Sequence, residues 1–255
     1  MQDSKMMEMQ YIEKLSKYLT CFNIKQIDSN KLKISSKFVN NIYSLVDCNR
    51  IPRDGLLLAD KILDEDIQYR IVDFCSGSGV VLAGLYIRGA KQLFGIELDN
   101  VSESPLCCNL PKKNTLLIKK GDIFDRDFLK LSLMDADIIT INPPQLPGNY
   151  EKDSINFGGK NGYEFAEKII YSICEYTSFF KKNGKLYLIG FDHLYNYLKN
   201  SLKLYNLHLK EIFRENIPIT CDSMIINKLP NMTYPTNYKN NSFYTVPITV
   251  MCIFS

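Results

Sequence analysis

The run Asn142-Pro143-Pro144-Gln145 could hold an amino or amide group for chemistry at its nitrogen. It follows an apolar stretch typical of a buried strand, so Asn142 would present its side-chain carbonyl where that strand ends. The two proline rings fix φ and remove backbone N–H groups, which makes the loop rigid. A rigid carbonyl acceptor can bind an N–H group while the nitrogen lone pair attacks an electrophile. A strand-ending turn without chemistry would explain the run, taken alone, equally well.

A glycine-containing turn, Asp73-Phe74-Cys75-Ser76-Gly77-Ser78-Gly79, lies between a predicted strand and a predicted helix. Glycines allow a backbone to approach a ligand closely, and a helix N-terminus offers free N–H groups. The pattern is not GxGxxG, and no Walker lysine follows it. A dinucleotide site or a P-loop is therefore the weaker interpretation.

Three acidic residues, Asp73, Glu97 and Asp122, each lie at or just after the end of a predicted strand. Glu97 could accept hydrogen bonds from a ribose diol, and Asp122 could bind an adenine amino group. Each acid alone could equally be a helix cap or part of a turn. Because open α/β sheets bind ligands at the carboxyl ends of their strands, the three together favour a ligand site.

Strands and helices alternate along the part of the chain that must position these residues. Helices are predicted at 56–63, 80–87, 165–180 and 194–204, and strands at 70–74, 92–97, 116–118, 136–141, 185–190, 207–213 and 244–254. This alternation predicts an α/β fold with a doubly wound, mostly parallel, seven-stranded sheet. Residues 228–243, rich in Asn, Pro, Thr and Tyr, are expected to form a long loop.

Residues 1–50 are expected to form a small α+β segment ahead of the main domain at 51–255. Apolar side chains at helical spacing predict a helix at 8–21, and residues 23–27 and 31–34 predict a hairpin. This segment carries no chemical motif. It could serve as a lid over the site or simply pack against the main domain.

Composition limits the classes of function. The 255 residues carry a net charge of +3, and the lysine pairs are scattered, which does not indicate a nucleic-acid partner. The eight cysteines form no CxxC pair and no zinc-ligand cluster, so no metal is expected. Reduced cysteines, a polar N-terminus and no membrane-length apolar run predict a cytoplasmic protein. The oligomeric state is left open.

These features together resemble the class I S-adenosylmethionine-dependent methyltransferases over roughly residues 52 to 255. The run from Asp73 to Gly79 resembles their first motif, with Cys75 in place of its usual first glycine. The resemblance implies S-adenosyl-L-methionine as cofactor and S-adenosyl-L-homocysteine as product.

The resemblance also implies which residues surround the cofactor. It places Gly77 and Gly79 beside the methionine part and Glu97 on the ribose. Asp122 and Ile123 would lie around the adenine. Asp73, Cys75 and Asn142 complete the expected cofactor site.

The run Asn142 to Gln145 is similar to the NPPY motif of amino-directed methyltransferases, which act on release-factor glutamine or on nucleobase amines. The segments Arg50-Ile51-Pro52-Arg53-Asp54-Gly55 and Phe157-Gly158-Gly159-Lys160-Asn161-Gly162 resemble parts of the glutamine-directed branch. The second segment could equally be a turn that leads into a helix. Asn142 and the carbonyl of Pro143 would accept the N–H groups of the acceptor, and Pro144 would stiffen the loop.

Gln145 stands where the family has a tyrosine. An aromatic ring there could stack on a planar acceptor, a contact worth about 1–3 kcal/mol per base in nucleic-acid sites. Glutamine instead donates and accepts hydrogen bonds. We therefore expect N-methylation of a small metabolite or peptide-like amine or amide. The alternatives are a nucleic-acid or protein-glutamine methyltransferase, and a catalytically inactive partner subunit that binds the cofactor.

No histidine is required by this mechanism. His193 and His208 are expected to have surface or packing roles. Asp192 could accept a proton or cap a helix.

Overall fold

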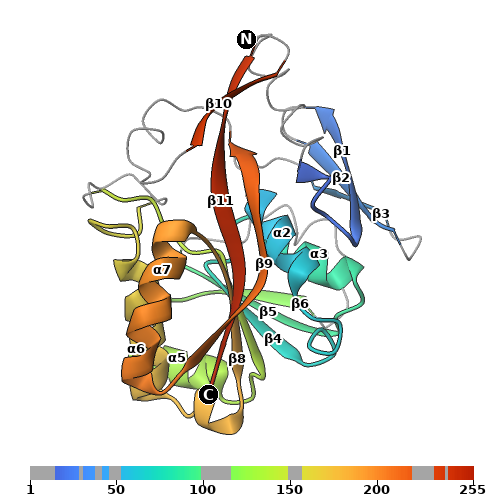
Figure 1. Ribbon diagram of the computed structural model, residues 1–255. Helices are drawn as coiled ribbons and strands as arrows, with labels where there is room; N and C mark the ends of the chain where they lie inside the picture. The colour runs from blue at the N-terminus through green and yellow to red at the C-terminus, as the bar shows by residue number, and fades with distance from the viewer. Residues whose placement is uncertain are drawn as a thin grey trace.

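The computed structural model describes the backbone of residues 15–28, 31–37, 42–45, 53–98, 116–148, 157–219, 233–238 and 241–255. These residues form two sheets (Figure 1). The smaller sheet is antiparallel and consists of β1 (Phe22–Asp28), β2 (Lys31–Ser36) and β3 (Ile42–Leu45). It contains the predicted hairpin, which is confirmed, and adds β3, which the sequence analysis did not predict.

The larger sheet has eight strands, in the order β10-β11-β8-β7-β4-β5-β6, with β9 on the other edge of β11. Its strands are β4 (Arg70–Phe74), β5 (Gln92–Glu97), β6 (Leu116–Lys120), β7 (Ile138–Ile141), β8 (Lys185–Phe191), β9 (His208–Ile219), β10 (Thr233–Tyr238) and β11 (Asn241–Phe254). Strands β4 to β8 pair in parallel, whereas β11 is antiparallel to its three neighbours. The predicted mostly parallel seven-stranded sheet is confirmed, with β10 as an eighth strand.

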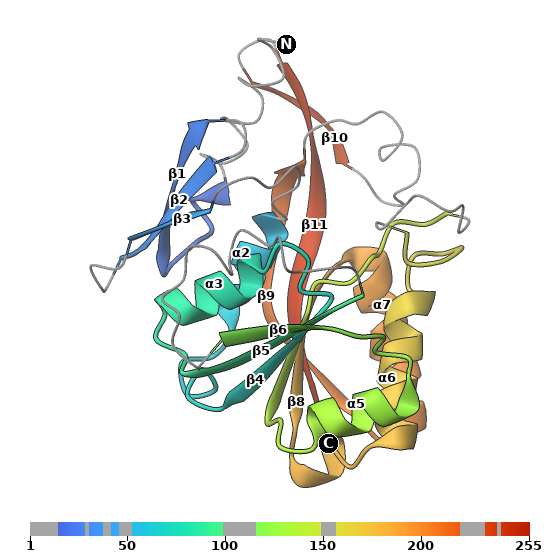
Figure 2. The same cartoon turned by 180° about the vertical axis from the view of Figure 1, so that it is seen from behind.

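Helices cover both faces of this sheet (Figures 1 and 2). The helices are α2 (Arg53–Lys61), α3 (Val80–Ile87), α5 (Arg126–Leu133), α6 (Glu164–Tyr176) and α7 (Asp192–Ser201). Buried side chains of α2 and α3 form one apolar core, and those of α5, α6 and α7 form the other. The central strands β4 and β7 are buried along nearly their whole length, as expected for strands covered on both faces.

The structure differs from the sequence analysis in two segments: one predicted loop contains a strand, and one helix was not predicted. The expected loop at 228–243 contains β10, because pairing with β11 outweighs the weak strand propensity of its Asn, Pro and Thr residues. Helix α5 was not predicted; it has eight residues and begins where the Asp125 side chain accepts the N–H of Phe128 at 2.8 Å.

The N-terminal segment is tied firmly to the main sheet and its helices. The buried Asp60 carboxylate on α2 accepts the backbone N–H groups of Thr20 (2.9 Å) and Cys21 (2.7 Å). The hydroxyl of Tyr18 donates to the carbonyl of Asn216 on β9 at 3.1 Å. The predicted helix at 8–21 falls largely outside the described residues. Residues 18, 20 and 21 are thus hydrogen-bonded to the main sheet and its helices.

Strands β9 and β11 run past the carboxyl end of β8. Phe191, the last residue of β8, pairs with Ile248, so residues 241–247 of β11 lie beyond that strand. Thr245 pairs with Pro218 on one edge and lies next to β10 on the other. The antiparallel strands β9 and β11 therefore extend beyond the edge at which the parallel strands end (Figure 1).

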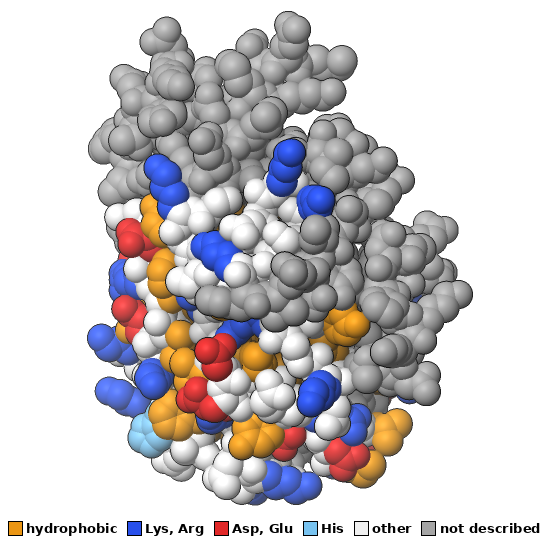
Figure 3. All heavy atoms as spheres, turned by 90° about the vertical axis from the view of Figure 1, so that its right-hand side faces the viewer, with side chains coloured by type: hydrophobic (Ala, Val, Ile, Leu, Met, Phe, Trp, Pro, Cys, Tyr) orange, Lys and Arg blue, Asp and Glu red, His pale blue; other side chains and the backbone are white. Residues whose placement is uncertain are grey.

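The described surface carries charges of both signs. On the face shown in Figure 3, basic and acidic side chains are interspersed among the described residues. The described residues include no group of three or more His, Cys, Asp or Glu side chains placed to hold a metal ion. None of the described helices is long and apolar enough to cross a membrane.

Candidate functional site

The predicted cofactor and acceptor residues meet at one edge of the large sheet. Strands β5, β4 and β7 are parallel neighbours, with Phe74 in register with Ile96 and with Ile141. The carboxyl ends of these strands therefore lie side by side. Residues that are far apart in the sequence, from Asp73 to Asn142, reach a common edge because the strands share one direction.

The turn after β4 has the conformation that its glycines indicate. Cys75, Gly77 and Gly79 have φ values of 54°, 49° and 73°, in the left-handed region. The Ser76 hydroxyl donates to the carbonyl of Asp73 at 2.8 Å, and the N–H of Gly79 donates to the carbonyl of Ser76 at 2.6 Å. Cys75 thus adopts a left-handed conformation that costs glycine less steric strain than other residues. This agrees with the glycine found at this position in the first motif of the methyltransferases that the sequence resembles.

Glu97 holds this turn from the neighbouring strand. One carboxylate oxygen accepts the N–H of Gly77 at 2.6 Å, and the other accepts the N–H of Leu98 at 2.8 Å. Each oxygen of an ionised carboxylate has a second lone pair, so hydroxyl groups of a ligand can still be bound. Among the described residues, a Cβ atom added to Gly77 would meet no atom closer than the carbonyl oxygen of Cys75 at 3.9 Å, so it would make no clash there.

Sequence reasoning missed Gly95, on which the same turn depends. A Cβ atom at this position would lie 2.7 Å from the Ser76 hydroxyl and 2.8 Å from a methyl group of Leu82. The signal was a single glycine inside an otherwise apolar strand, which often marks a close approach of another segment.

Asp73 is fully buried and is only partly satisfied by hydrogen bonds. Thr140 on β7 donates its hydroxyl to Oδ1 of Asp73 at 2.6 Å, whereas Oδ2 has no partner among the described residues. Burial raises the pKa of Asp73 to about 7; hydrogen bonds from Thr140 and Ser76 oppose this rise, and the charge of Glu97 adds to it. Thr140 was another missed residue, signalled by one polar side chain within the apolar run of β7.

Asp122 and Ile123 lie in the turn between β6 and α5. The exposed Asp122 carboxylate accepts the N–H of Phe124 at 2.8 Å, and the side chain of Ile123 is largely buried. Phe124 packs edge-on against Phe165 of α6 with 5.4 Å between ring centroids. A buried aliphatic side chain beside an exposed carboxylate is suited to a flat, polar-edged ring such as adenine.

Asn142 leaves the sheet directly after β7. Its side chain is half-buried, and no hydrogen bond joins it to another residue of the described part of the chain. Pro143 is buried behind it. The Asn142 amide is thus placed on a rigid support with its hydrogen-bonding capacity still available.

Gln145 turns its side chain into the protein. The side chain is 5% exposed, and its Oε1 accepts the backbone N–H of Phe191 at 2.7 Å. The backbone carbonyl of Gln145 lies 3.0 Å from Nε2 of His193. Oε1 of Gln145 is therefore bonded to the protein's own backbone. The sequence analysis instead expected this side chain to form hydrogen bonds with a methyl acceptor.

The glycine segment Phe157 to Gly162 packs on this loop. The N–H of Gly158 donates to the carbonyl of Leu146 at 3.0 Å, and the N–H of Gly148 donates to that of Gly159 at 2.9 Å. The same segment leads into α6 through a hydrogen bond from Phe165 to Gly158. The segment thus forms the turn that leads into α6, and it also contacts the loop that follows Asn142, so its resemblance to the glutamine-directed branch and its role as a turn are compatible.

The remaining candidates have structural partners. Asp192 lies in the first turn of α7 and forms an ion pair with Arg214 at 2.5 Å, and Phe191 occupies the N-cap position. His208 is exposed and packs beside Phe254. Residues 50–52 of the other glutamine-branch segment lie outside the described residues, and Arg53 begins α2.

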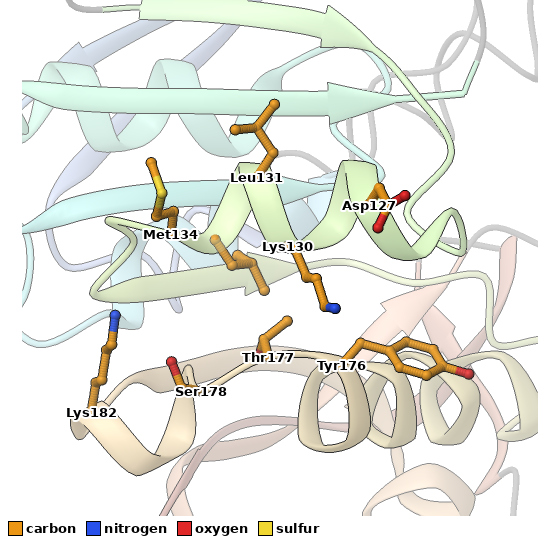
Figure 4. Close-up of a pocket in the computed structure, with 9 residues that line it drawn as sticks. Asp127, Lys130, Leu131, Met134, Tyr176, Thr177, Ser178 and Lys182 are labelled. Atoms are coloured by element: carbon orange, nitrogen blue, oxygen red, sulfur yellow. The ribbon is translucent and has the colours of Figure 1, made fainter.

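A shallow pocket of about 430 Å³ lies away from this edge, between α5 and the end of α6 (Figure 4). Its lining includes Lys130, Met134, Tyr176 and Lys182. None of the predicted cofactor or acceptor residues lines it, so it is not part of the candidate site.

Comparison with solved structures gave matches to proteins that are described as methyltransferases or putative methyltransferases. A Pyrococcus horikoshii protein described as a "putative RNA methyltransferase" matches with a TM-score of 0.52 and 16% identity, over 96% of this chain and 94% of that one. P. horikoshii TYW2 in complex with MeSAdo matches with a TM-score of 0.47 and 14% identity, over 89% and 72% of the two chains. Precorrin-6y C5,15-methyltransferase from Geobacter metallireducens matches with a TM-score of 0.43 and 13% identity, over 79% and 87%.

Neither a scan against models of known protein families nor a search of curated proteins gave a match. The likeness to the first structure establishes the fold, which is the Rossmann-like fold of methyltransferases. At 16% identity, it does not carry over a reaction or a substrate, because one fold serves many functions.

Proposed function

We propose that the protein is an S-adenosylmethionine-dependent N-methyltransferase that acts on an amine or amide of a small metabolite or peptide-like substrate. The proposal rests mainly on one observation. A glycine turn braced by Glu97 and a rigid loop presenting Asn142 converge at the carboxyl edge of a methyltransferase-type sheet. A subunit that only binds the cofactor would need the glycine turn but would have no use for the loop that presents Asn142.

The residues at this edge fit the cofactor. No described residue crowds the Cα of Gly77, where the methionine part would lie, and Glu97 can accept the two ribose hydroxyl groups. Asp122 and Ile123 offer a carboxylate and a buried apolar surface for adenine. Oδ2 of the buried Asp73 has no hydrogen-bond partner among the described residues, and a cationic ligand nearby would stabilise the charged carboxylate.

Bound S-adenosylmethionine supplies a methyl group on a positively charged sulfur. The protein's part is to bring a nitrogen lone pair in line with that methyl group. The Asn142 side-chain carbonyl and the Pro143 backbone carbonyl would accept the N–H groups of the acceptor and thereby orient its lone pair. The rate then comes chiefly from orientation and exclusion of water and does not depend on a strong base.

The structure of the loop supports an acceptor that is not held by stacking. Because Gln145 is buried and bonded to Phe191, its side chain offers no flat surface to a nucleobase. Hydrogen bonds to the carbonyls of Asn142 and Pro143 would instead define the acceptor. This favours an amine or amide over a flipped base.

Incubation with methyl-labelled S-adenosylmethionine and a cell extract tests the proposal. The extract is then separated into metabolite, protein and nucleic-acid fractions. We expect label in the metabolite fraction or in short peptides. Label in nucleic acid would contradict the acceptor class, and label in intact protein would favour the glutamine-directed alternative. Cofactor binding without any transfer would favour the inactive partner subunit, and absence of cofactor binding would refute the proposal.

A further inference from the structure

The loop Asn142 to Gln145 is held from one side by the junction between β8 and α7. Gln145 receives two hydrogen bonds from that junction: its Oε1 accepts the N–H of Phe191 at 2.7 Å, and its backbone carbonyl lies 3.0 Å from Nε2 of His193. Both oxygens of one residue are thus engaged by residues two positions apart.

The side-chain carbonyl of Gln145 accepts a hydrogen bond in the position where a further residue of β7 would have supplied a backbone carbonyl. Strands β7 and β8 pair in parallel up to Ile141 and Leu188, and β7 then ends at the two prolines. The N–H of Phe191 lies beyond this last pair and would lack a carbonyl partner from β7. The side-chain carbonyl of Gln145 accepts this N–H instead, so the loop is hydrogen-bonded to β8 although β7 has ended.

His193 completes the attachment. It is half-buried, and its ring lies beside that of Phe191 with centroids 6.2 Å apart. A carbonyl partner requires Nε2 to carry a proton. Burial lowers the pKa of His193, which favours the neutral ring with its proton on Nε2. The same N–H would also be present in the charged ring, so the attachment does not depend on titration.

The glycine segment packs against the same loop and also approaches His193. A Cβ atom on Gly162 would lie 2.5 Å from the carbonyl oxygen of Gln145 and 2.6 Å from Nε2 of His193. A Cβ atom on Gly158 would lie 2.5 Å from the carbonyl oxygen of Pro144. Only glycine allows this close approach. The loop is therefore held both by the junction between β8 and α7 and by the glycine segment, an arrangement that we call the clamp.

We propose that Gln145 and His193 are positioning residues that fix the carbonyls of Asn142 and Pro143 for the methyl acceptor. This inference rests on the proposed function and deepens it. Neither residue need touch the substrate. Each acts by keeping the loop in one place, and a displacement of about 1 Å at reacting groups costs on the order of 100-fold in rate.

Two substitutions of His193 separate positioning from packing. His193→Phe keeps a ring but removes the N–H donor, whereas His193→Gln keeps an N–H donor. His208→Phe, at an exposed position on β9, is the matched control. Transfer of label from methyl-labelled S-adenosylmethionine to the extract fraction labelled by the wild type is measured together with cofactor affinity. Hydrogen exchange at the N–H groups of Gly148 and Gly158 reports on the loop itself.

We expect His193→Phe to slow transfer by about 10- to 100-fold and to speed exchange at Gly148 and Gly158, with cofactor affinity within about twofold. His193→Gln should retain most of the activity and protection, and Gln145→Leu should resemble His193→Phe. Equal impairment by Phe and Gln at position 193, or unchanged transfer and exchange in His193→Phe, would overturn the inference. If the wild type transfers no label, the proposed function fails, and the exchange measurement still decides whether the clamp exists.

Discussion

The hydroxyl of Thr140 donates a 2.6 Å hydrogen bond to the carboxylate of Asp73, joining β4 and β7 directly below the candidate site. The two residues are paired in register in the parallel sheet, and both are fully buried. The strand that carries the glycine turn is thereby linked to the strand that leads into the loop from Asn142 to Gln145. The bond also uses only one oxygen of Asp73, which leaves the other buried without a described partner.

Asp73 should make stability depend on pH. Its pKa rises from 3.8 in the unfolded chain to about 7 in the folded protein, so the native state holds a proton that the unfolded state releases. This contribution is fully present below pH 4 and is lost as the pH rises through 7. We expect the wild type to lose about 2–3 kcal/mol more than Asp73→Asn between pH 5 and pH 8. Urea unfolding at both pH values checks this, and parallel pH profiles would contradict it.

Glu97 should contribute to cofactor affinity. Glu97→Gln keeps the size of the side chain but removes one charged acceptor for the ribose hydroxyl groups. We expect the dissociation constant for S-adenosylmethionine to rise by about 10-fold, equivalent to about 1.4 kcal/mol. Calorimetric titration measures the change. The exposed Glu65→Gln serves as a control, and equal affinities of the two variants would argue against the assigned role.

Asn142 should be required for transfer and not for cofactor binding. Asn142→Ala removes the carbonyl that orients the acceptor, and we expect the rate of label transfer to fall by on the order of 100-fold. Cofactor affinity should be unchanged in the same titration. Asn200→Ala, on the exposed face of α7, is the matched control. Normal turnover in Asn142→Ala would refute the acceptor assignment.

Comparing alanine substitutions of Gly162 and Gly89 separates the cost of steric contact from the cost of backbone strain. Both have left-handed φ values, 86° and 100°, but only Gly162 has neighbours within reach of a Cβ atom. Gly89→Ala should cost about 1–2 kcal/mol in unfolding free energy, from strain alone. Gly162→Ala should cost more and should slow transfer, because the added methyl group meets Gln145 and His193. Chemical denaturation and the transfer assay measure the two effects; indistinguishable variants would speak against the clamp.

Asp60 should anchor the N-terminal segment. Asp60→Ala leaves the partly buried N–H groups of Thr20 and Cys21 without their carboxylate partner. We expect a loss of about 2–4 kcal/mol in unfolding free energy and faster proteolysis of residues 15–37. Asp135→Ala removes a largely exposed partner of Arg70 and should cost at most about 1 kcal/mol. If both variants unfold alike, the anchor is unimportant.

The sequence by itself determined the fold class and selected the residues that we propose for the cofactor site. Alternation of apolar strands and amphipathic helices is a local property, and the acids and glycines fall at strand ends that any parallel sheet brings together. The order of the strands, with β4 between β5 and β7, places Asp73, Glu97 and Asn142 at one edge. No long-range information was needed to select these residues.

Only the tertiary structure decided what Thr140, Gly95, His193 and Gln145 do. Their roles depend on contacts between segments that are distant in the sequence: Thr140 with Asp73, Gly95 with Ser76, and Gln145 with Phe191 and His193. The direction of a single side chain after a proline pair is set by its available partners. A local pattern does not contain those partners, and so the inward turn of Gln145 emerged only with the fold.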